Sequence, residues 1–285
     1  MASEAHFPAL ISVVITVRNE EPNLRRLFEG LLVQEPPFEI VFVDALSRDR
    51  SFEIAEEYAR RHPGIILAFQ RYGSRGVGRN AGVARARGEF VAFIDGDCVP
   101  DPAWLSALRR ELRHAEVVAG RTEPIGRVRY GALERIELYQ KGSDVTYPSC
   151  NLAYRRALFD RLGGFDPRFI TAEDIDLNLR AVRRGATIQY APDAVVYHQM
   201  RTTVLRFLYQ AFWNGYGRKQ LTEKHGSLWS DYRPRRLLQR QRGGMAWLRL
   251  CAAAFGYSAR IVGGWGSRLT PAASSPIVAS PGTER

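Results

Sequence analysis

The sequence predicts an α/β protein with a mostly parallel central sheet, helices on both faces of the sheet, and a helical C-terminal extension. Over the first 95 residues, short and nearly continuous apolar runs alternate with helical segments. Parallel strands have this composition because helices cover both of their faces. Beyond residue 200 the pattern changes to helical segments that are rich in basic and aromatic residues.

The first half is expected to alternate strictly between strands and helices. Strands are expected at residues 11–17, 39–44, 64–70 and 89–95, with helices at residues 22–31, 51–61 and 76–87. Ligands of such sheets bind beyond the carboxyl ends of the strands. The polar residues that follow these strands, Arg18 to Glu20, Asp44, and Asp95 to Asp97, are therefore expected to meet at one edge.

The second half is more mixed. Helices are expected at residues 103–113, 130–140, 172–184 and 203–218, strands at residues 150–155, 187–190 and 194–197, and an apolar amphipathic segment at residues 245–262. A Pro/Arg-rich stretch covers residues 231–243. The expected organisation is a main domain over residues 1–200, with halves at about 1–100 and 101–200, a helical extension over residues 201–268, and a disordered Ser/Pro/Gly tail over residues 269–285.

Composition narrows the class of protein. The chain has 285 residues, 45% of them hydrophobic and 25% charged, which excludes wholesale disorder. Its net charge of +11 suggests an anionic partner such as nucleic acid, lipid headgroups or phosphorylated small molecules. The three cysteines are far apart and form no CxxC, which argues against a disulfide framework or a zinc site. With neither a signal peptide nor a membrane span expected, we predict a cytoplasmic protein.

Two carboxylates follow the fourth strand. Asp95 and Asp97 are separated by Gly96, which allows a tight turn. Carboxylates at this spacing can hold a hard divalent cation, and Mg²⁺ or Mn²⁺ often also bridges substrate phosphates. An acidic turn after a strand is the alternative.

Several motifs in chain order resemble family-2 glycosyltransferases of the GT-A fold, which has a Rossmann-like, mostly parallel sheet. They are VVITVRNEEPNL (13–24), VFVDALSRDRS (41–51), the stretch 75–105 with its IDGD, GGFDPRF (163–169), and AEDIDLNLRAVRRG (172–185). The resemblance covers about residues 11–200. It implies an inverting, metal-assisted transfer of a sugar from a UDP- or GDP-sugar donor to a hydroxyl of a saccharide or lipid-linked acceptor, as in cell-envelope polysaccharide or glycolipid synthesis.

The resemblance also implies roles for individual residues. Asp174 would be the general base and Asp97 a ligand of the divalent cation, Mn²⁺ or Mg²⁺, with His198 as a further ligand. The residues that would line the donor nucleotide site are Thr16, Arg18, Glu20, Asp44, Arg79 and Asp95. The residues that would contact the acceptor or the donor sugar are Asn151, Glu173, Trp213 and Arg218.

Several of these residues also have a structural alternative, and His198 could be a satisfied surface or core residue. Asp174 could instead be a helix N-cap, and Asp44 could be an ordinary turn residue. Arg79 could pair with acids on its helix, and Asn151 could cap a strand. The second motif, DALSRD, departs from the family's usual DDGSTD and leaves Asp44 without a second acid at Ala45.

The extension is expected to pack, to close over the substrate, or to contact a membrane. Residues 201–249 hold eleven Lys or Arg against Glu223 and Asp231. The segment at residues 245–262 suits a helix lying in the interface beside anionic headgroups, at the cytoplasmic face of the membrane. It could equally pack on its own domain or on a second copy in a homodimer.

Two other functions compete. A nucleotidyltransferase that makes nucleotide sugars would have the same kind of sheet and acidic metal site. It would also need a Gly-rich, basic loop directly after the first strand, where this sequence has RNEEPN. A non-catalytic nucleic-acid binder would use the basic C-terminal region. The acidic residues would repel nucleic-acid phosphates, so no nucleic-acid partner is expected.

Overall fold

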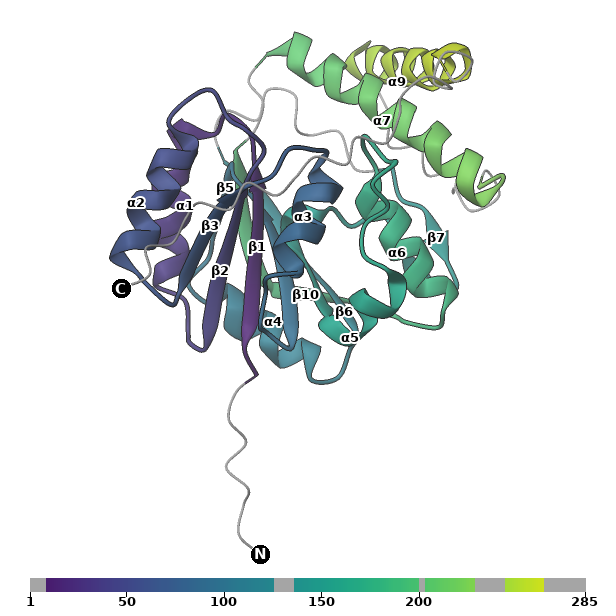
Figure 1. The fold of residues 1–285 in the computed structure, drawn as a ribbon. Coiled ribbons are helices and arrows are strands. Elements are labelled where there is room, and N and C mark those ends of the chain that lie inside the picture. The colour runs from purple at the N-terminus through teal and green to yellow at the C-terminus, as the bar shows by residue number, and fades with distance from the viewer. Residues whose placement is uncertain (1–8, 126–135, 200–202, 229–243, 264–285) are drawn as a thin grey trace, which may run out of the picture.

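The computed structural model describes residues 9–125, 136–199, 203–228 and 244–263. Its centre is an eight-stranded sheet in the order β3-β2-β1-β4-β9-β6-β10-β5 (Figure 1). The strands are β1 Ile11–Val17, β2 Phe38–Asp44, β3 Ile66–Gln70, β4 Phe90–Asp95, β5 Cys98–Pro100, β6 Val117–Ile125, β9 Leu152–Arg155 and β10 Ile188–Gln199.

The sheet is mostly parallel, as predicted. β1 pairs in parallel with β2 and β4, β2 with β3, and β6 with β10. β9 is antiparallel to both of its neighbours, β4 and β6, and β5 is antiparallel to β10. The single sheet therefore takes strands from both halves of the chain.

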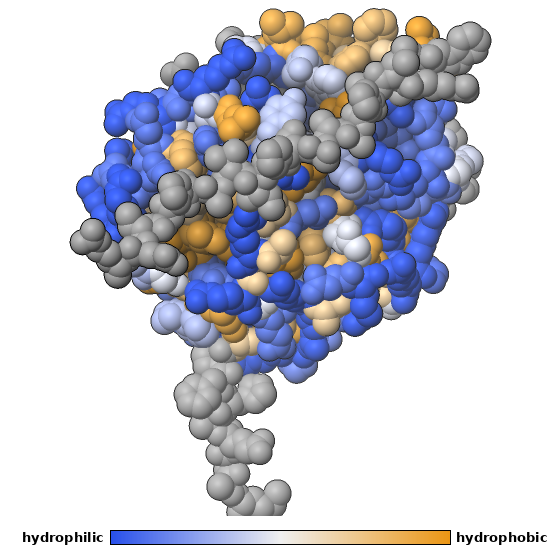
Figure 2. All heavy atoms as spheres, viewed as in Figure 1, coloured by the Kyte–Doolittle hydropathy of each residue, from blue (hydrophilic) through white to orange (hydrophobic). Residues whose placement is uncertain are grey.

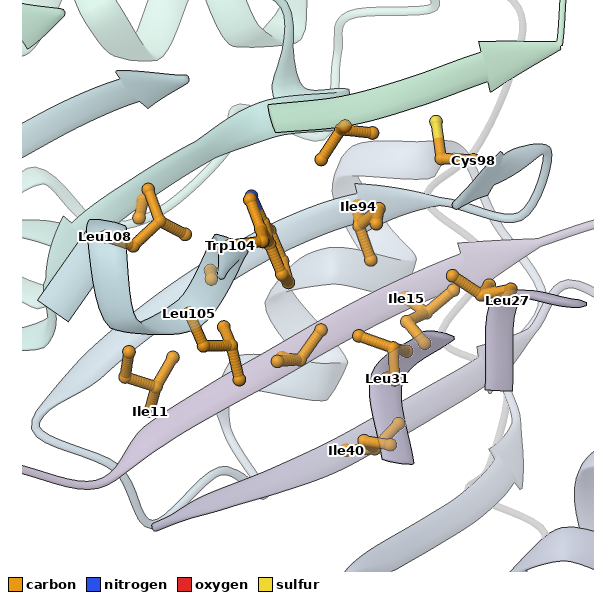
Figure 3. Packing of buried hydrophobic residues seen from close by; sticks show 14 of the residues in the cluster. Ile11, Ile15, Leu27, Leu31, Ile40, Ile94, Cys98, Trp104, Leu105 and Leu108 are labelled. Atoms are coloured by element: carbon orange, nitrogen blue, oxygen red, sulfur yellow. The ribbon is translucent and has the colours of Figure 1, made fainter. Parts of the chain in front are cut away.

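Helices cover both faces. They are α1 Glu21–Leu32, α2 Ser51–Arg61, α3 Arg75–Val83, α4 Trp104–Leu112, α5 Arg156–Leu162 and α6 Glu173–Arg183. Val13 and Ile15 of β1 face a core that includes α1, α2 and α4, whereas Val14 faces the core that includes α3, α5 and α6. Successive side chains of a strand point to opposite faces, so a strand that is apolar throughout must be covered on both sides. Figure 3 shows part of the first core around Trp104.

Several elements differ from the sequence prediction, and one of them is the short strand β5, which was not expected. β6 was not expected, since its four buried residues Val117–Gly120 lead into polar residues and a proline, which dilutes the apolar signal. α5 was not expected either. The two strands expected at residues 187–190 and 194–197 are one strand, β10, with a shift in register between Ala191 and Val195. The helix expected at residues 130–140 is wrong where the structure describes it, from residue 136 onward. There Tyr139–Gln140 forms the short strand β7, which pairs with β8 Ser143–Asp144. Residues 130–135 lie outside the described residues.

Beyond the sheet, α7 Val204–His225 and α9 Gly244–Gly263 pack against each other (Figure 1). A Cβ on Gly215 would lie 1.8 Å from the Ala253 carbonyl oxygen, and one on Gly256 would lie 1.9 Å from that of Phe212. The two backbones touch at these glycines. Among the described helices, none combines the length and apolar character needed to cross a membrane. The Pro/Arg-rich stretch and the expected disordered tail lie outside the described residues, and the domain boundaries stay predictions.

Candidate active site

Polar residues meet at the carboxyl edge of the sheet. Near the end of β1, Thr16 is aligned with Asp95 at the end of β4. Val17 is aligned with Asp44 at the end of β2. Because the three strands are parallel neighbours, their ends lie side by side, as the pattern predicts.

Two glycines let the surrounding backbone approach β1. A Cβ on Gly78 would lie 2.5 Å from Thr16 Cγ2, and one on Gly96 would lie 2.6 Å from Val17 Cγ1. Real Cβ atoms do not come this close, so α3 and the turn after β4 require glycine at these positions. Their approach brings Arg79, the next residue on α3, to the ends of the strands.

Arg79 joins the two halves of the site. Its buried guanidinium donates to Asp95 Oδ1 at 2.8 Å and to Glu173 Oε1 at 2.7 Å. Its side chain is only 1% exposed. Burial would lower the pKa of Arg79, but the charges of Asp95 and Glu173 outweigh it and raise the pKa. Arg79 therefore holds the start of α6 beside the end of β4.

The two acids that begin α6 lie in different surroundings. Glu173 is buried, and this burial raises its pKa against the lowering effect of Arg79. Asp174 is half-buried. Its Oδ2 accepts from Ser149 N at 3.1 Å, and its Oδ1 accepts from Ile175 N at 2.8 Å. Asp174 is thus a fixed and partly exposed carboxylate, which a general base requires, whereas Glu173 is committed to Arg79.

Asp97 and His198 form the candidate cation site. His198 Nε2 lies 3.4 Å from Asp97 Oδ2. Burial would lower the pKa of His198, but the hydrogen bond and charge of Asp97 raise it to about 9. Asp97, Cys98 and His198 each offer a ligand atom within 4.8 Å of the others. This pairing of carboxylate and imidazole fits a borderline cation such as Mn²⁺.

The first strand–helix turn adds a third acid. Burial raises the pKa of the Glu20 carboxyl, and the charges of Asp97 and Asp95 act in the same direction. Arg18 is exposed beside it. The Thr16 hydroxyl oxygen is buried, and within the described residues it has no hydrogen-bond partner. A bound cation would relieve the repulsion among acids that gather in this way.

Asp44 also lies at the carboxyl edge of the sheet, but it is not exposed to solvent. Its carboxylate is fully buried and accepts from Ser47 N at 3.0 Å and from Gln70 Nε2 at 2.9 Å, with the Ser47 hydroxyl as a further donor. In this arrangement Asp44 fixes the turn after β2. Contact with a nucleotide base would need one of these donors to be exchanged.

The chain matches the model of glycosyl transferase family 2 over residues 12–163, which is more than half of its length. This chain belongs to glycosyltransferase family 2. It also matches the model of glycosyl transferase family group 2 over residues 90–274. The protein is therefore a glycosyltransferase, and this assignment favours glycosyl transfer over nucleotidyl transfer or a non-catalytic nucleic-acid-binding function.

Curated relatives and solved structures agree. Glycosyltransferase AglE of Haloferax volcanii is 27% identical over 205 residues, which are 67% of each chain. The pre-mycofactocin glycosyltransferase of Mycobacterium tuberculosis is 30% identical over 225 residues, but the match spans only 46% of that relative. The mannosyltransferase PcManGT of Pyrobaculum calidifontis, solved with GDP-Man and Mn²⁺, has a TM-score of 0.64 at 20% identity, covering 95% of this chain and 79% of its own. S. aureus TarS 1–349, solved with UDP-GlcNAc, has a TM-score of 0.57 at 22% identity, covering 71% and 66%. These likenesses show the GT-A fold.

Asn151 of this glycosyltransferase is used inside the sheet. Its Oδ1 accepts from Trp104 Nε1 at 2.8 Å, and its Nδ2 donates to the carbonyl oxygens of Arg121 and Ala194, each at 2.9 Å. The side chain is 1% exposed. These contacts hold the irregular stretch of β10, and they favour the structural alternative over contact with a sugar.

Trp213 and Arg218 lie on α7. Trp213 packs edge-on against the neighbouring rings of Phe212 and Tyr216. Arg218 Nη2 donates to the Ile136 carbonyl oxygen at 3.0 Å. Both side chains are half-buried, and both remain candidates for acceptor contact.

Sequence reasoning missed a second role of α7, which is to hold the loop before the acids of α6. Gln220 Nε2 donates to the Arg168 carbonyl oxygen at 2.9 Å, and its Oε1 accepts from Ile170 N at 3.2 Å. A Cβ on Gly217 would lie 2.8 Å from Thr171 Cγ2. No local pattern announces these contacts, because they join residues about fifty positions apart in the chain.

Proposed function

We propose that this glycosyltransferase transfers a sugar from a UDP- or GDP-linked donor to a hydroxyl acceptor, with inversion at the anomeric carbon, help from a divalent cation, and Asp174 as general base. The main support for the proposal is that the buried side chain of Arg79 forms two ion pairs, one with Asp95 and one with Glu173. They tie Asp95, two residues from the cation position, to Glu173, the neighbour of the base. The donor side and the acceptor side of one reaction therefore share a single cluster.

The departing nucleoside diphosphate gains negative charge, and a divalent cation when bound stabilises that charge. Asp97 and His198 would hold this cation, since carboxylate and imidazole are ligands that Mn²⁺ accepts. Asp95 is fixed by Arg79, and its side chain is 27% exposed, so it can face the ribose or a water molecule of the cation. Thr16, Arg18 and Glu20 would line the nucleotide, and Asp44 would support the loop under its base.

The acceptor hydroxyl has a pKa far above neutrality and needs a base within hydrogen-bond reach. Asp174 is suited to this role, since Ser149 and the start of α6 orient its two oxygens while part of the side chain stays exposed. Attack from the side opposite the leaving group inverts the anomeric centre. Trp213 and Arg218 would border the acceptor, with Asn151 supporting the sheet beneath.

Nucleotide binding is tested by thermal unfolding of the full chain with UDP or GDP, with and without Mn²⁺. A ligand at about one hundred times its Kd adds about 2.7 kcal/mol to the free energy of unfolding, which for a chain of this size raises Tm by about 5 to 10 °C. We expect the rise only when nucleotide and Mn²⁺ are both present. If neither nucleotide raises Tm with Mn²⁺ present, the donor site is wrongly assigned.

The base is tested by Asp174→Asn. General-base catalysis contributes about 100- to 10,000-fold, so turnover should fall by that range while nucleotide binding persists. Asp160→Asn on α5, where the side chain is 58% exposed, is the matched control and should leave turnover unchanged. Near-normal turnover in Asp174→Asn removes that residue from the role of base.

For the acceptor side we propose contact with an anionic membrane surface through α9. The exposed positions of α9 after its first residue are uncharged: Trp247, Leu248, Cys251, Ala254, Phe255, Ser258, Ile261 and Val262. They repeat at three- and four-residue spacing, so they share one face of the helix. Figure 2 shows apolar side chains along the top of the molecule, where α7 and α9 lie. An apolar face on a basic extension is the pattern of a helix lying in a lipid interface.

Vesicle co-sedimentation tests this proposal, with phosphatidylcholine vesicles compared with vesicles that also contain phosphatidylglycerol. Burying one large apolar side chain contributes about 1.5 to 3 kcal/mol, so Trp247→Ser or Phe255→Ser should weaken vesicle binding about tenfold or more. Val33→Ser, at a site 65% exposed in the main domain, should not. If the wild type binds no vesicles but sediments as a dimer that Phe255→Ser dissociates, this face joins two copies instead.

A further inference from the structure

The last turns of α7 carry charged side chains that have no part in the proposed reaction. Asp176 of α6 is fully buried, and Lys224 Nζ and His225 Nε2 each lie 2.7 Å from its Oδ1. Arg180 Nε donates to its Oδ2 at 2.8 Å. Figure 1 shows this end of α7 next to α6. Because a buried carboxylate left unpaired is costly, Asp176 fixes α7 against α6.

Lys224 also contacts the loop at residues 163–172, which leads into α6. Its Nζ lies 2.7 Å from Asp166 Oδ2. Hydrogen bonds from Arg168 and Lys224 lower the pKa of the Asp166 carboxyl, so this acid is ionised at neutral pH. The Asp166 and Asp176 side chains are only 9% and 0% exposed, so solvent screens these attractions less than it screens a surface ion pair. One ammonium therefore joins the loop to the helix.

His225 supplies a hydrogen bond rather than a charge. Its Nδ1 lies 3.0 Å from Arg183 Nη1. A guanidinium can only donate, so Nδ1 accepts and the proton on Nε2 is donated to Asp176. Lys224 is therefore the residue through which this end of α7 brings positive charge to Asp176 and Asp166.

The general base lies in the segment that Lys224 holds at both ends. Asp174 stands between Asp166 and Asp176 in the chain, in the first turn of α6. Gln220 bonds to the loop backbone, whereas Lys224 bonds to the loop and to α6 together. Misplacement of a reacting group by about 1 Å can cost about 100-fold in rate. A contact that sets where α6 starts relative to the loop therefore bears directly on catalysis.

We propose that Lys224 is a positioning residue for glycosyl transfer: its ammonium joins the loop to α6 and so fixes the place of the general base. The kinetic consequence rests on the proposed function, whereas the joining of loop and helix does not. The candidate cation site should be unaffected, because Asp97 and His198 lie on other elements. Loss of the ammonium should therefore lower kcat and leave donor KM and nucleotide binding unchanged.

Hydrogen–deuterium exchange of the full chain tests the joining without an activity assay. Phe169 N and Ile170 N are both hydrogen-bonded, so their exchange reports opening of the loop. In Lys224→Met, exchange over residues 166–176 should become about tenfold faster or more. Lys219→Met on the same helix is the matched control, because the Lys219 ammonium lies 5.5 Å from the centre of an aromatic ring of α9, and it should leave this exchange unchanged.

Donor hydrolysis tests whether this contact positions the base. It is followed as release of UDP from UDP-glucose and of GDP from GDP-mannose, with Mn²⁺ present and water as the acceptor. The water oxygen bonds to the anomeric carbon, the bond from that carbon to the diphosphate breaks, and the proton of the water passes to Asp174. Lys224→Met should lower kcat about tenfold or more at unchanged donor KM, and Lys219→Met should leave both unchanged.

Two further variants separate positioning from a general loss of stability. Lys224→Arg keeps a cation at this position and should recover most of the lost kcat. In Asp174→Asn no base is left to position, so adding Lys224→Met should lower kcat no further. Additive losses would overturn the proposal, because Lys224 would then not act through the base.

Unchanged exchange or unchanged kcat in Lys224→Met would also overturn the proposal. Thermal unfolding checks that each variant is folded, and Lys224→Gln replaces Lys224→Met if the latter fails to fold. A wild-type chain that hydrolyses neither donor, and whose Tm is not raised by UDP or GDP with Mn²⁺, would count against the proposed function alone. The exchange measurement would then still decide whether Lys224 joins the loop to α6.

Discussion

The ion pairs of Arg79 predict a large loss of stability in Arg79→Met. Methionine retains most of the apolar volume of the arginine stem but leaves the buried Glu173 carboxylate without its cation. Arg79 is 1% exposed and the Glu173 side chain 5% exposed. Removing one partner from a buried pair costs about 3 to 5 kcal/mol, whereas the more exposed Asp95 adds less than about 1 kcal/mol. We expect the free energy of unfolding to fall by about 3 to 5 kcal/mol.

Urea-induced unfolding at neutral pH measures this loss, and two variants calibrate it. Arg25→Met removes an exposed pair with Glu57, whose side chains are 49% and 29% exposed, and should cost less than about 1 kcal/mol. Arg79→Met combined with Glu173→Gln leaves no buried charge unpaired at this point, so it should recover part of the loss. With the single variant Glu173→Gln added, the three losses complete a double-mutant cycle that gives the coupling energy of the two side chains.

The stability of Arg79→Met should also depend on pH in a defined direction. Burial raises the pKa of Glu173, and Arg79 is a group that lowers it, so removing Arg79 raises the pKa further. A carboxyl with a raised folded-state pKa contributes stability below its unfolded value, about 4.3, and this contribution is lost as the pH rises through the folded value. The deficit against wild type should therefore be larger at about pH 8 than at about pH 5. A loss below about 1 kcal/mol at neutral pH, equal to that of Arg25→Met, would refute the reasoning.

Three further predictions rest on the same contacts. Gln220→Leu should lower kcat about tenfold or more, because α7 then no longer holds the loop before the general base. Steady-state kinetics measures kcat, and thermal shift should show that nucleotide binding is unchanged. An equal loss of kcat and of nucleotide binding would contradict this prediction. Gly78→Ala should cost about 1 to 3 kcal/mol in urea unfolding, since its Cβ would meet Thr16 Cγ2 at 2.5 Å, whereas Gly244→Ala, which meets nothing within 4 Å, should be neutral. Burial would raise the pKa of Asp176, but hydrogen bonds from α7 outweigh it and lower the pKa. The stability that Asp176 contributes should therefore be present above about pH 4 and lost as the pH falls further, and urea unfolding across pH should show no such loss in Asp176→Asn.

The bounds of a helix or strand were predicted correctly where the periodicity of its sequence is regular. β1 and α2 begin and end at the expected residues. β1 is a run of β-branched residues interrupted only by Ser12, and α2 is a regular amphipathic run, so each pattern leaves little choice. β6 escaped prediction although it lies near the middle of the sheet. Its stability comes from pairing with β9 and β10 rather than from its own composition, and contacts between distant strands leave no mark in a single segment.

The residues of the candidate site also divide into those that sequence patterns identified and those whose surroundings only the structure shows. Family motifs along the chain identified Asp97, His198 and Asp174 as residues of interest. Sequence reasoning could not tell which of two adjacent acids is buried. Glu173 turns inward to Arg79, whereas Asp174 stays partly exposed. Both acids lie in the first turn of α6, and the left-handed conformation of Ala172, with φ of 62°, fixes where that helix starts.

The order of residues therefore determined the α/β class, the family motifs and the meeting of acids at one edge, because each follows from periodicity or from residues a few positions apart. Tertiary structure alone decided that Arg79 would bind acids from two distant segments. It also decided that Gln220 of α7 would hold the loop before the acids of α6. The physical reason is that ion-pair and hydrogen-bond geometry depends on distance in space, and the fold brings Arg79 against Glu173, which lies 94 positions away in the chain.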